Sequence, residues 1–174
     1  MTPCARIFVA GLMMKHLLLM FPLALLLAGC NETAPNAPQP IVRGPLAIER
    51  IGGGYNGGLM EPARLLIRDP RQFADVWAKA WSGMPPMPPL PSVDFTSSVV
   101  IVVAMGGQAT GGYAIEVKRI TAEGDRLIVN VESVMPGAGC AVTLMLTQPF
   151  DIVRVPVRAS SAEFFERAVV RVCR

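Results

Sequence analysis

Histidine is almost absent from this sequence. The single histidine, His16, lies beside a leucine-rich block, and a chain without that block would contain none. Catalysis by Ser-His-Asp or Cys-His groups, and zinc sites built on imidazole, depend on this residue type. We therefore predict that the protein is not an enzyme, and we expect no catalytic residue, no metal site and no cofactor.

Charge is also scarce. Only 17% of the 174 residues are charged, and 16 Lys and Arg against 13 Asp and Glu give a formal charge of +3. Such a weak positive balance does not predict nucleic acid as a partner. The length suits one domain. Hydrophobic residues, by contrast, make up 52% of the chain, and they are most concentrated in residues 17–28.

The N-terminal segment has the features of a secretory signal. Lys15 precedes an apolar run at 17–27, which is too short for a spanning helix and contains Pro22. The run ends in Leu-Ala-Gly followed by Cys30, which resembles a bacterial lipobox. We predict a lipoprotein signal peptide at residues 1–29 and acylation (palmitate) of Cys30. The alternative is an ordinary signal peptide with a chance cysteine.

Residues 30–45 are predicted to be a lipidated tether, because 31–45 contain four prolines and few apolar residues. Several acyl chains would hold the protein on a membrane. Asn31 follows the cysteine where lipoproteins retained at the inner membrane tend to carry aspartate. We therefore expect a lipid-anchored protein of the bacterial cell envelope, on the outer membrane and facing the periplasm.

The remaining residues, 46–174, are predicted to form one β-rich domain with a single helix. Residues 69–72 (DPRQ) supply an N-cap, a proline at N1 and a capping-box glutamine. An apolar stripe then continues to a stop at Gly83; its members are Phe73, Val76, Trp77, Ala80 and Trp81. We interpret the stripe as a core-facing side, the alternative being a tryptophan platform for a ligand.

Strands dominate the rest of the domain. Residues 98–105 form an apolar run typical of a strand buried on both faces. Alternating residues on either side of Gly124-Asp125 predict a hairpin. We also expect a turn at 52–58, strands at 142–146, 152–157 and 168–173, and a short capped turn at 160–163. The predicted fold class is α+β, mostly β: an antiparallel sheet curled into a barrel or sandwich with one packed amphipathic helix.

Cys140 and Cys173 are the thiols that remain after Cys30 and the signal segment. Outside the cytoplasm, such a pair more often forms a disulfide than a reactive site. We predict a Cys140–Cys173 disulfide.

The most distinctive segment is Gly106–Tyr113 (GGQATGGY), which lies between two predicted strands. Glycines allow a tight turn, whereas exposed polar groups on such a loop favour binding. Gln108 and Thr110 have no packing role evident in the sequence, and we assign their polarity to a partner. The predicted partner-binding residues are Gly107, Gln108, Thr110, Gly111, Gly112 and Tyr113.

The segments Val93–Phe95, Gly107–Ile115, Met135–Cys140 and Leu146–Pro149 together resemble the PrcB C-terminal domain. The resemblance covers about residues 46–158. It implies a lipoprotein that binds and stabilises a surface protease complex, with no catalytic residues. The Thr-Gly-Gly-Tyr sequence at 110–113 is also similar to the Thr-Thr-Gly-Tyr loop of chagasin-like cysteine protease inhibitors.

We therefore predict a non-enzymatic envelope lipoprotein that binds a protein partner, a protease being the candidate that the resemblance implies. Two alternatives stay open. One is a protease inhibitor that uses the 106–113 loop, and the other is a periplasmic module that binds a small ligand or glycan through Trp77, Trp81 and Tyr113.

Overall fold

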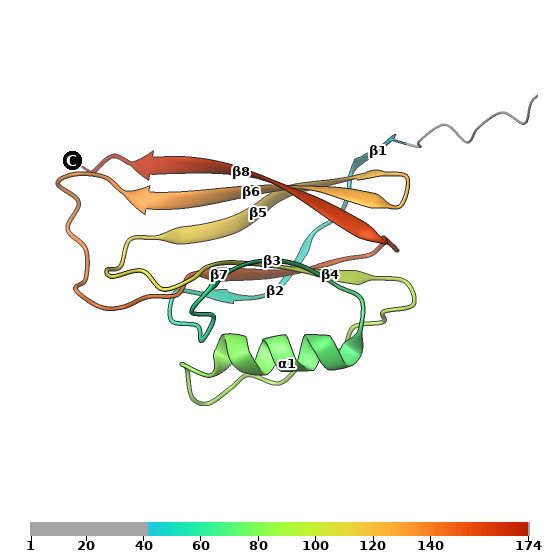
Figure 1. The fold of residues 1–174 in the computed structure, drawn as a ribbon, viewed down its shortest axis with the longest axis horizontal. Coiled ribbons are helices and arrows are strands. Elements are labelled where there is room, and N and C mark those ends of the chain that lie inside the picture. The colour runs from blue at the N-terminus through green and yellow to red at the C-terminus, as the bar shows by residue number, and fades with distance from the viewer. Residues whose placement is uncertain (1–41, 174) are drawn as a thin grey trace, which may run out of the picture. The chain divides into compact units, whose positions relative to one another are not determined.

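The computed structural model describes residues 42–173, which contain one helix and two four-stranded sheets (Figure 1). The helix, α1, spans Pro70–Trp81. The strands are β1 (Val42–Pro45), β2 (Glu49–Gly54), β3 (Pro62–Ile67), β4 (Val99–Met105), β5 (Ala114–Glu123), β6 (Arg126–Pro136), β7 (Phe150–Val155) and β8 (Ser161–Arg171). Within the described residues, no helix has the length and hydropathy of a membrane span.

The two sheets pack face to face as a sandwich. One has the order β1-β5-β6-β8 and the other β2-β7-β4-β3. No ladder joins the sheets in residues 42–173, so they are not closed into a barrel. The helix covers the outer face of the β2-β7-β4-β3 sheet (Figure 1). The predicted fold class is confirmed, and of its two architectures the sandwich is the one observed.

Strand β4 serves both hydrophobic cores, as its continuous apolar run predicts. Val99, Ile101 and Val103 point between the sheets, where they join a cluster with β5, β6 and β7. Val100 and Val102 point the other way, toward the helix. Alternate side chains of a strand lie on opposite faces, so an uninterrupted apolar run places this strand in the middle layer.

The helix begins and packs as predicted. The Asp69 carboxylate accepts hydrogen bonds from the backbone N–H groups of Arg71 and Gln72, both at 2.9 Å. Phe73 and Trp77 are buried against the sheet. The Trp77 indole N–H donates to the Pro88 carbonyl at 3.1 Å, so the proline-rich segment after the helix lies across that ring.

One strand pair differs from the predicted antiparallel arrangement. Strand β8 pairs in parallel with β6 along its whole length, from Arg126↔Ser161 to Pro136↔Arg171. The reason is that β7, which lies between them in sequence, belongs to the other sheet. It returns the chain to the end of the sandwich at which β6 begins. Strand β8 therefore runs in the same direction as β6.

Four segments differ from the structure predicted by the local pattern. In the predicted turn at 52–58, Gly52–Gly54 belong to β2 and pair with β7. Residues 142–146 form no ladder and are in a loop, where the Thr143 carbonyl accepts a hydrogen bond from the Gly111 N–H. The predicted turn at 160–163 belongs mostly to β8, whose partner strand β6 cannot be read from local sequence. Strand β1 occupies 42–45, the last residues assigned to the tether, and pairs with β5.

Candidate functional site

The predicted binding segment connects β4 to β5. Two of its glycines have a backbone conformation that other residues rarely adopt. We call residues 106–113 the glycine loop. Gly106 has φ +76° and Gly112 has φ +89°, a region that L side chains rarely adopt. A Cβ on Gly112 would also lie 3.0 Å from the Val142 side chain. These glycines therefore have a structural role whatever the loop binds.

The glycine loop is attached to a second segment, residues 137–149 between β6 and β7, which we call the apolar loop. Gln108 and Thr147 exchange backbone hydrogen bonds of 2.7 and 2.9 Å. The Gly111 N–H donates to the Thr143 carbonyl at 2.9 Å. The Thr147 hydroxyl also donates to the Thr110 carbonyl at 2.8 Å. The two loops therefore form one unit.

A third segment, the turn after β2, joins the same end of the sandwich. The Gln148 N–H donates to the Tyr55 carbonyl at 2.5 Å, and the Gly57 N–H donates to the Gln148 carbonyl at 3.3 Å. The Gly107 N–H donates to the Met60 carbonyl at 2.9 Å. Loops from three separate parts of the chain thus converge around the predicted binding residues.

The side chains of Gln108 and Thr110 both have partners within the loop. The Gln108 amide donates to the Met105 carbonyl at 3.2 Å, and the Thr110 hydroxyl donates to the Gly111 carbonyl at 3.2 Å. Both residues are half-buried. Hydrogen bonds within the loop therefore explain why these two side chains are polar. Their polarity alone no longer indicates a partner.

The apolar loop exposes large hydrophobic side chains, which sequence reasoning assigned to a strand. Leu144 is 93% exposed, and Met145 and Leu146 are about half exposed. Tyr55 and Met60 are exposed in the neighbouring segments. We call these five residues the apolar patch. Exposed apolar side chains on joined loops are typical of an interaction site.

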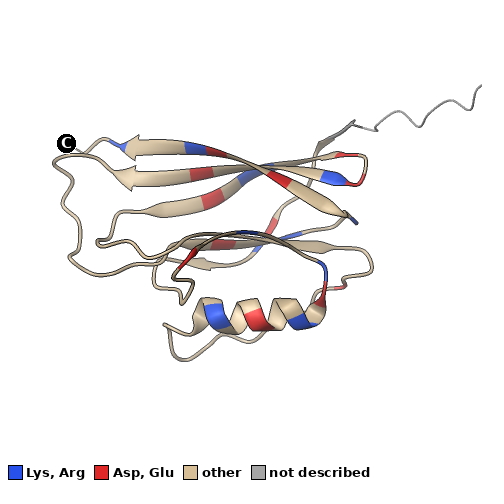
Figure 2. Cartoon of the chain, viewed as in Figure 1, with Lys and Arg blue, Asp and Glu red and all other residues tan. Residues whose placement is uncertain are grey.

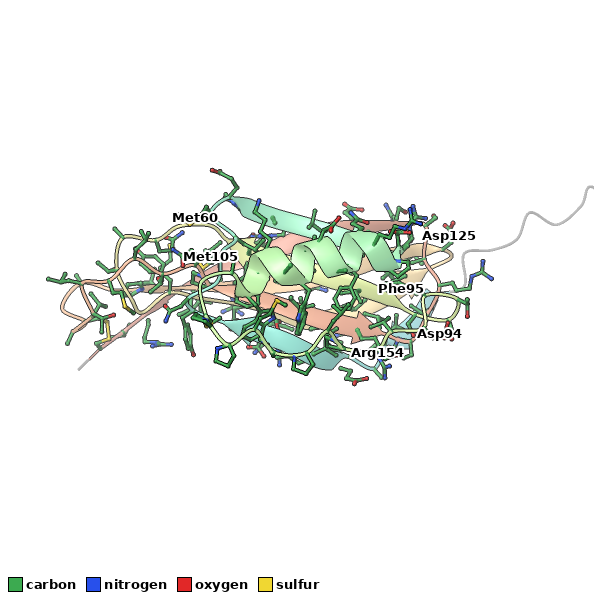
Figure 3. The ribbon with its side chains drawn as sticks, turned by 90° about the horizontal axis from the view of Figure 1, so that it is seen from below. Met60, Asp94, Phe95, Met105, Asp125 and Arg154 are labelled. Atoms are coloured by element: carbon green, nitrogen blue, oxygen red, sulfur yellow. A yellow bond between two sulfur atoms is a disulfide. The ribbon has the colours of Figure 1, made fainter. Side chains whose placement is uncertain are left out.

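The end of the sandwich that holds these loops has few charges (Figure 2). Residues 133–150 contain no charged side chain. Met60 and Met105 lie toward this end, whereas Asp94 and Asp125 lie toward the opposite end (Figure 3). The two ends of the domain therefore differ in chemistry, one apolar and one charged.

A cavity of about 300 Å³ opens between the converging loops. Tyr55 and Tyr113 contribute to its walls, together with Gly112, Met145 and Arg171 at the end of β8. A second cavity, of about 350 Å³, continues from it along β5. Tyr55 and Ala114 line both, so the two form a groove between the edges of β2 and β5.

At the far end of this groove, Asp151 links the two sheets. Its carboxylate is buried and accepts hydrogen bonds from the Arg50 guanidinium at 2.7 and 3.0 Å. The same carboxylate accepts from the Val117 backbone N–H at 2.8 Å. Arg50 also forms an ion pair with Glu116 at 3.0 Å. One side chain from β7 thus joins β2 to β5.

The charges of this network shift each other's protonation. The hydrogen bond to Asp151 raises the pKa of the Arg50 guanidinium, although partial burial opposes it. The hydrogen bond from Lys118 lowers the pKa of the Glu116 carboxyl, and the positive charge of Arg50 lowers it further against partial burial. Both residues are therefore held in their charged forms.

The predicted disulfide is present. Cys140 and Cys173 are bonded, with Cα atoms 5.1 Å apart and a sequence separation of 33. The bond joins the apolar loop to the residues that follow β8. The Gly137 N–H donates to the Arg171 carbonyl at 3.0 Å, close to the same junction. The covalent and hydrogen bonds together hold Arg171 beside the loops.

The tryptophan pair does not form an open ligand platform. Trp77 is 2% exposed, and Trp81 packs on Phe150 with ring centroids 5.4 Å apart. Both belong to the core between the helix and the sheet. The glycan or small-ligand alternative therefore loses two of the three side chains on which it was based, and only Tyr113 of them lines a cavity.

Some predicted features lie outside the described residues. These are the signal peptide at 1–29, Cys30 and most of the tether. In residues 42–173, no group of three or more His, Cys, Asp or Glu side chains is placed to hold a metal ion.

Comparison with protein families gives one match. Residues 99–156, from β4 to the residue after β7, match the family described as PrcB C-terminal. The match supports the resemblance to the PrcB C-terminal domain that the motifs within this segment predict. It includes the glycine loop and the apolar loop. No curated protein and no solved structure matches the chain.

Proposed function

We propose that the domain is a binding module that presents the joined glycine and apolar loops to a protein partner in the bacterial cell envelope. The observation that carries this proposal is the apolar patch. Leu144 is almost fully exposed although its loop is fixed by hydrogen bonds on both sides and by a disulfide. Exposed leucine on a fixed loop favours a partner that covers it.

The family supports a finer proposal. Its name is associated with a protease complex, and a protease is accordingly the partner class that we propose. In this account the domain has no catalytic role and is held at the outer membrane by acylation of Cys30, so that it keeps the protease near the surface and stabilises it. The inhibitor alternative uses the same loops but predicts that the protease loses activity on binding.

Capture of the partner tests the proposal. The full chain carries an affinity tag and is purified from detergent-solubilised envelopes together with its partner. The double change Leu144→Ser, Leu146→Ser should reduce the captured partner at least tenfold, because exposed apolar anchors dominate such interfaces. The matched control is Leu90→Ser, an exposed leucine in the segment over the helix.

Equal capture by the double variant and the parent would contradict the proposal. Once the partner is identified, its proteolytic activity and its half-life with and without the domain separate stabilisation from inhibition. A longer half-life with unchanged activity supports the stabilising role. A stoichiometric loss of activity supports the inhibitor.

A further inference from the structure

Part of one edge of strand β5 has no neighbouring strand among residues 42–173. Strand β1 pairs with β5 only at Thr121, Ala122 and Glu123. The chain then crosses to the other sheet and continues as β2, with a last bond from the Leu46 N–H to the Ile120 carbonyl. The first half of β5 therefore faces the groove, and no other strand of the described residues lies beside it.

Asp151 and Arg50, at the far end of the groove, show which way this edge of β5 faces. The Val117 N–H donates to Asp151 at 2.8 Å, and the Val117 carbonyl accepts from Arg50 at 3.4 Å. Backbone groups of every second residue in a strand point to the same edge. The N–H and C=O groups of Ile115 thus face the groove. Just before the strand, the Tyr113 N–H has no acceptor among residues 42–173.

The other end of the groove has the chemistry of an anion site. Arg171 lines the cavity there and forms no ion pair with any residue in 42–173. Gly112 lines the same cavity, and its N–H also has no acceptor among these residues. A guanidinium and free backbone N–H groups at a glycine turn are the donors that bind a carboxylate.

These features occur in an order that fits one ligand. Strand β5 begins at the glycine loop, so a peptide that pairs with it in the antiparallel direction ends at that loop. Its terminal carboxylate would then lie beside Arg171. Its last side chain would lie against Tyr55 and Met145, which are apolar walls of the cavity. From there to Val117 the free edge accommodates about four residues.

We propose that the groove between β2 and β5 binds the free C-terminal end of a partner polypeptide that terminates in an apolar residue, added as a short antiparallel strand on β5. This inference rests on the proposed function, because it states which part of the partner the loops receive. Backbone hydrogen bonds provide the affinity, and the carboxylate and last side chain provide the specificity.

Peptide binding tests the inference. The probe is a fluorescein-labelled pool of hexapeptides with a fixed C-terminal leucine and randomised preceding residues, titrated with the full chain in detergent and followed by fluorescence anisotropy. The pool with a free carboxylate should bind at least tenfold more tightly than the same pool with a C-terminal amide. A pool that is N-methylated at the third residue from the end should also bind at least tenfold more weakly, because it lacks one ladder hydrogen bond.

Arg171→Gln should abolish the preference for the carboxylate. Arg167→Gln is the matched control, since Arg167 also lies on β8 without an ion pair among the described residues, and it should keep the preference. Equal binding of acid and amide, or no binding of either pool, would overturn the inference. The amide comparison needs no change to the protein, so a folding defect in a variant cannot hide the result.

The outcomes also separate this inference from the proposed function. If the envelope partner is captured through Leu144 and Leu146 while no peptide binds, the C-terminal mode is wrong and the binding module stands. If the partner is captured equally without those leucines, the proposed function is wrong.

Discussion

Asp151 of β7 accepts a hydrogen bond from the Val117 backbone N–H of β5, across the gap between the two sheets. The same carboxylate pairs with Arg50 of β2. Asp151 is 2% exposed, so its charge depends on these two partners for compensation. This contact ends the free edge of β5 and fixes the separation of β2 and β5, which form the walls of the groove.

Replacement of Asp151 by alanine should lower the free energy of unfolding by about 2–4 kcal/mol, since it leaves the Val117 N–H unpaired in a buried place. Urea unfolding of the full chain measures the loss. Glu49→Gln is the control, because Glu49 forms an ion pair with Arg154 at the surface. It should cost less than about 1 kcal/mol. Similar losses in the two variants would show that Asp151 does not brace the sheets.

The disulfide should contribute about 3–4 kcal/mol to stability, because it closes a loop of 33 residues. The double change Cys140→Ser, Cys173→Ser should lower the urea midpoint accordingly. It should also weaken partner capture, since the bond holds the apolar loop beside Arg171. An unchanged midpoint would contradict the first expectation, and unchanged capture would contradict the second.

The glycine loop allows binding and folding to be tested separately. Gly112→Val should destabilise the fold by about 1–3 kcal/mol, because φ +89° is unfavourable for valine and the new side chain would crowd Val142. Gln108→Ala with Thr110→Ala should leave the melting temperature nearly unchanged, since each loses only a local bond in a loop.

The same double variant should weaken partner capture at least tenfold if these polar groups also reach the partner. If it unfolds early while the remaining folded protein binds normally, Gln108 and Thr110 serve the turn alone. That result would restrict the binding site to the apolar patch and the groove.

Acid should weaken the charge network at Glu116. Its pKa is lowered below the ordinary 4.5 in the folded protein, mainly by the hydrogen bond from Lys118. The stabilisation is therefore fully present above pH 4.5 and is lost as the pH falls through the lower folded pKa. Because Glu116 is 45% exposed, we expect less than about 1 kcal/mol. Unfolding curves of the parent and Glu116→Gln should differ at pH 7 and converge toward pH 3. A difference that grows at low pH would contradict this assignment.

The predicted acylation of Cys30 is tested by metabolic labelling with a clickable palmitate. The parent chain should take up the label, and Cys30→Ala should not. Label that persists in the variant, or that is absent from the parent, would contradict the lipoprotein prediction.

Local pattern predicted the parts of the fold that depend on local chemistry. The Asp69 cap, the apolar stripe of the helix and the buried β4 run all follow from short-range rules. The parallel β6–β8 pair does not, because its register depends on where β7 goes. The alternating pattern at 142–146 gave a strand, whereas Leu144 and Leu146 are exposed on a loop. Alternating apolar residues indicate a strand with one buried face only where a partner strand lies beside it.

The candidate site shows the same division. The glycine-rich segment and the cysteine pair could be found in the sequence by residue type and spacing. The apolar patch, the groove and the position of Arg171 could not, since they combine residues from β2, β5, β8 and two loops. Only the folded chain brings those segments to one end.

The central claim is that this apolar end contacts a protein partner, and site-specific photocrosslinking tests it most directly. A photoreactive phenylalanine analogue replaces Leu144 in one full-length variant and Asp125, toward the charged end, in another (Figure 3). Irradiation of intact envelopes should join the Leu144 variant to one discrete protein and give no such product from the Asp125 variant. The absence of a product at Leu144, or the same product from both positions, would contradict the account.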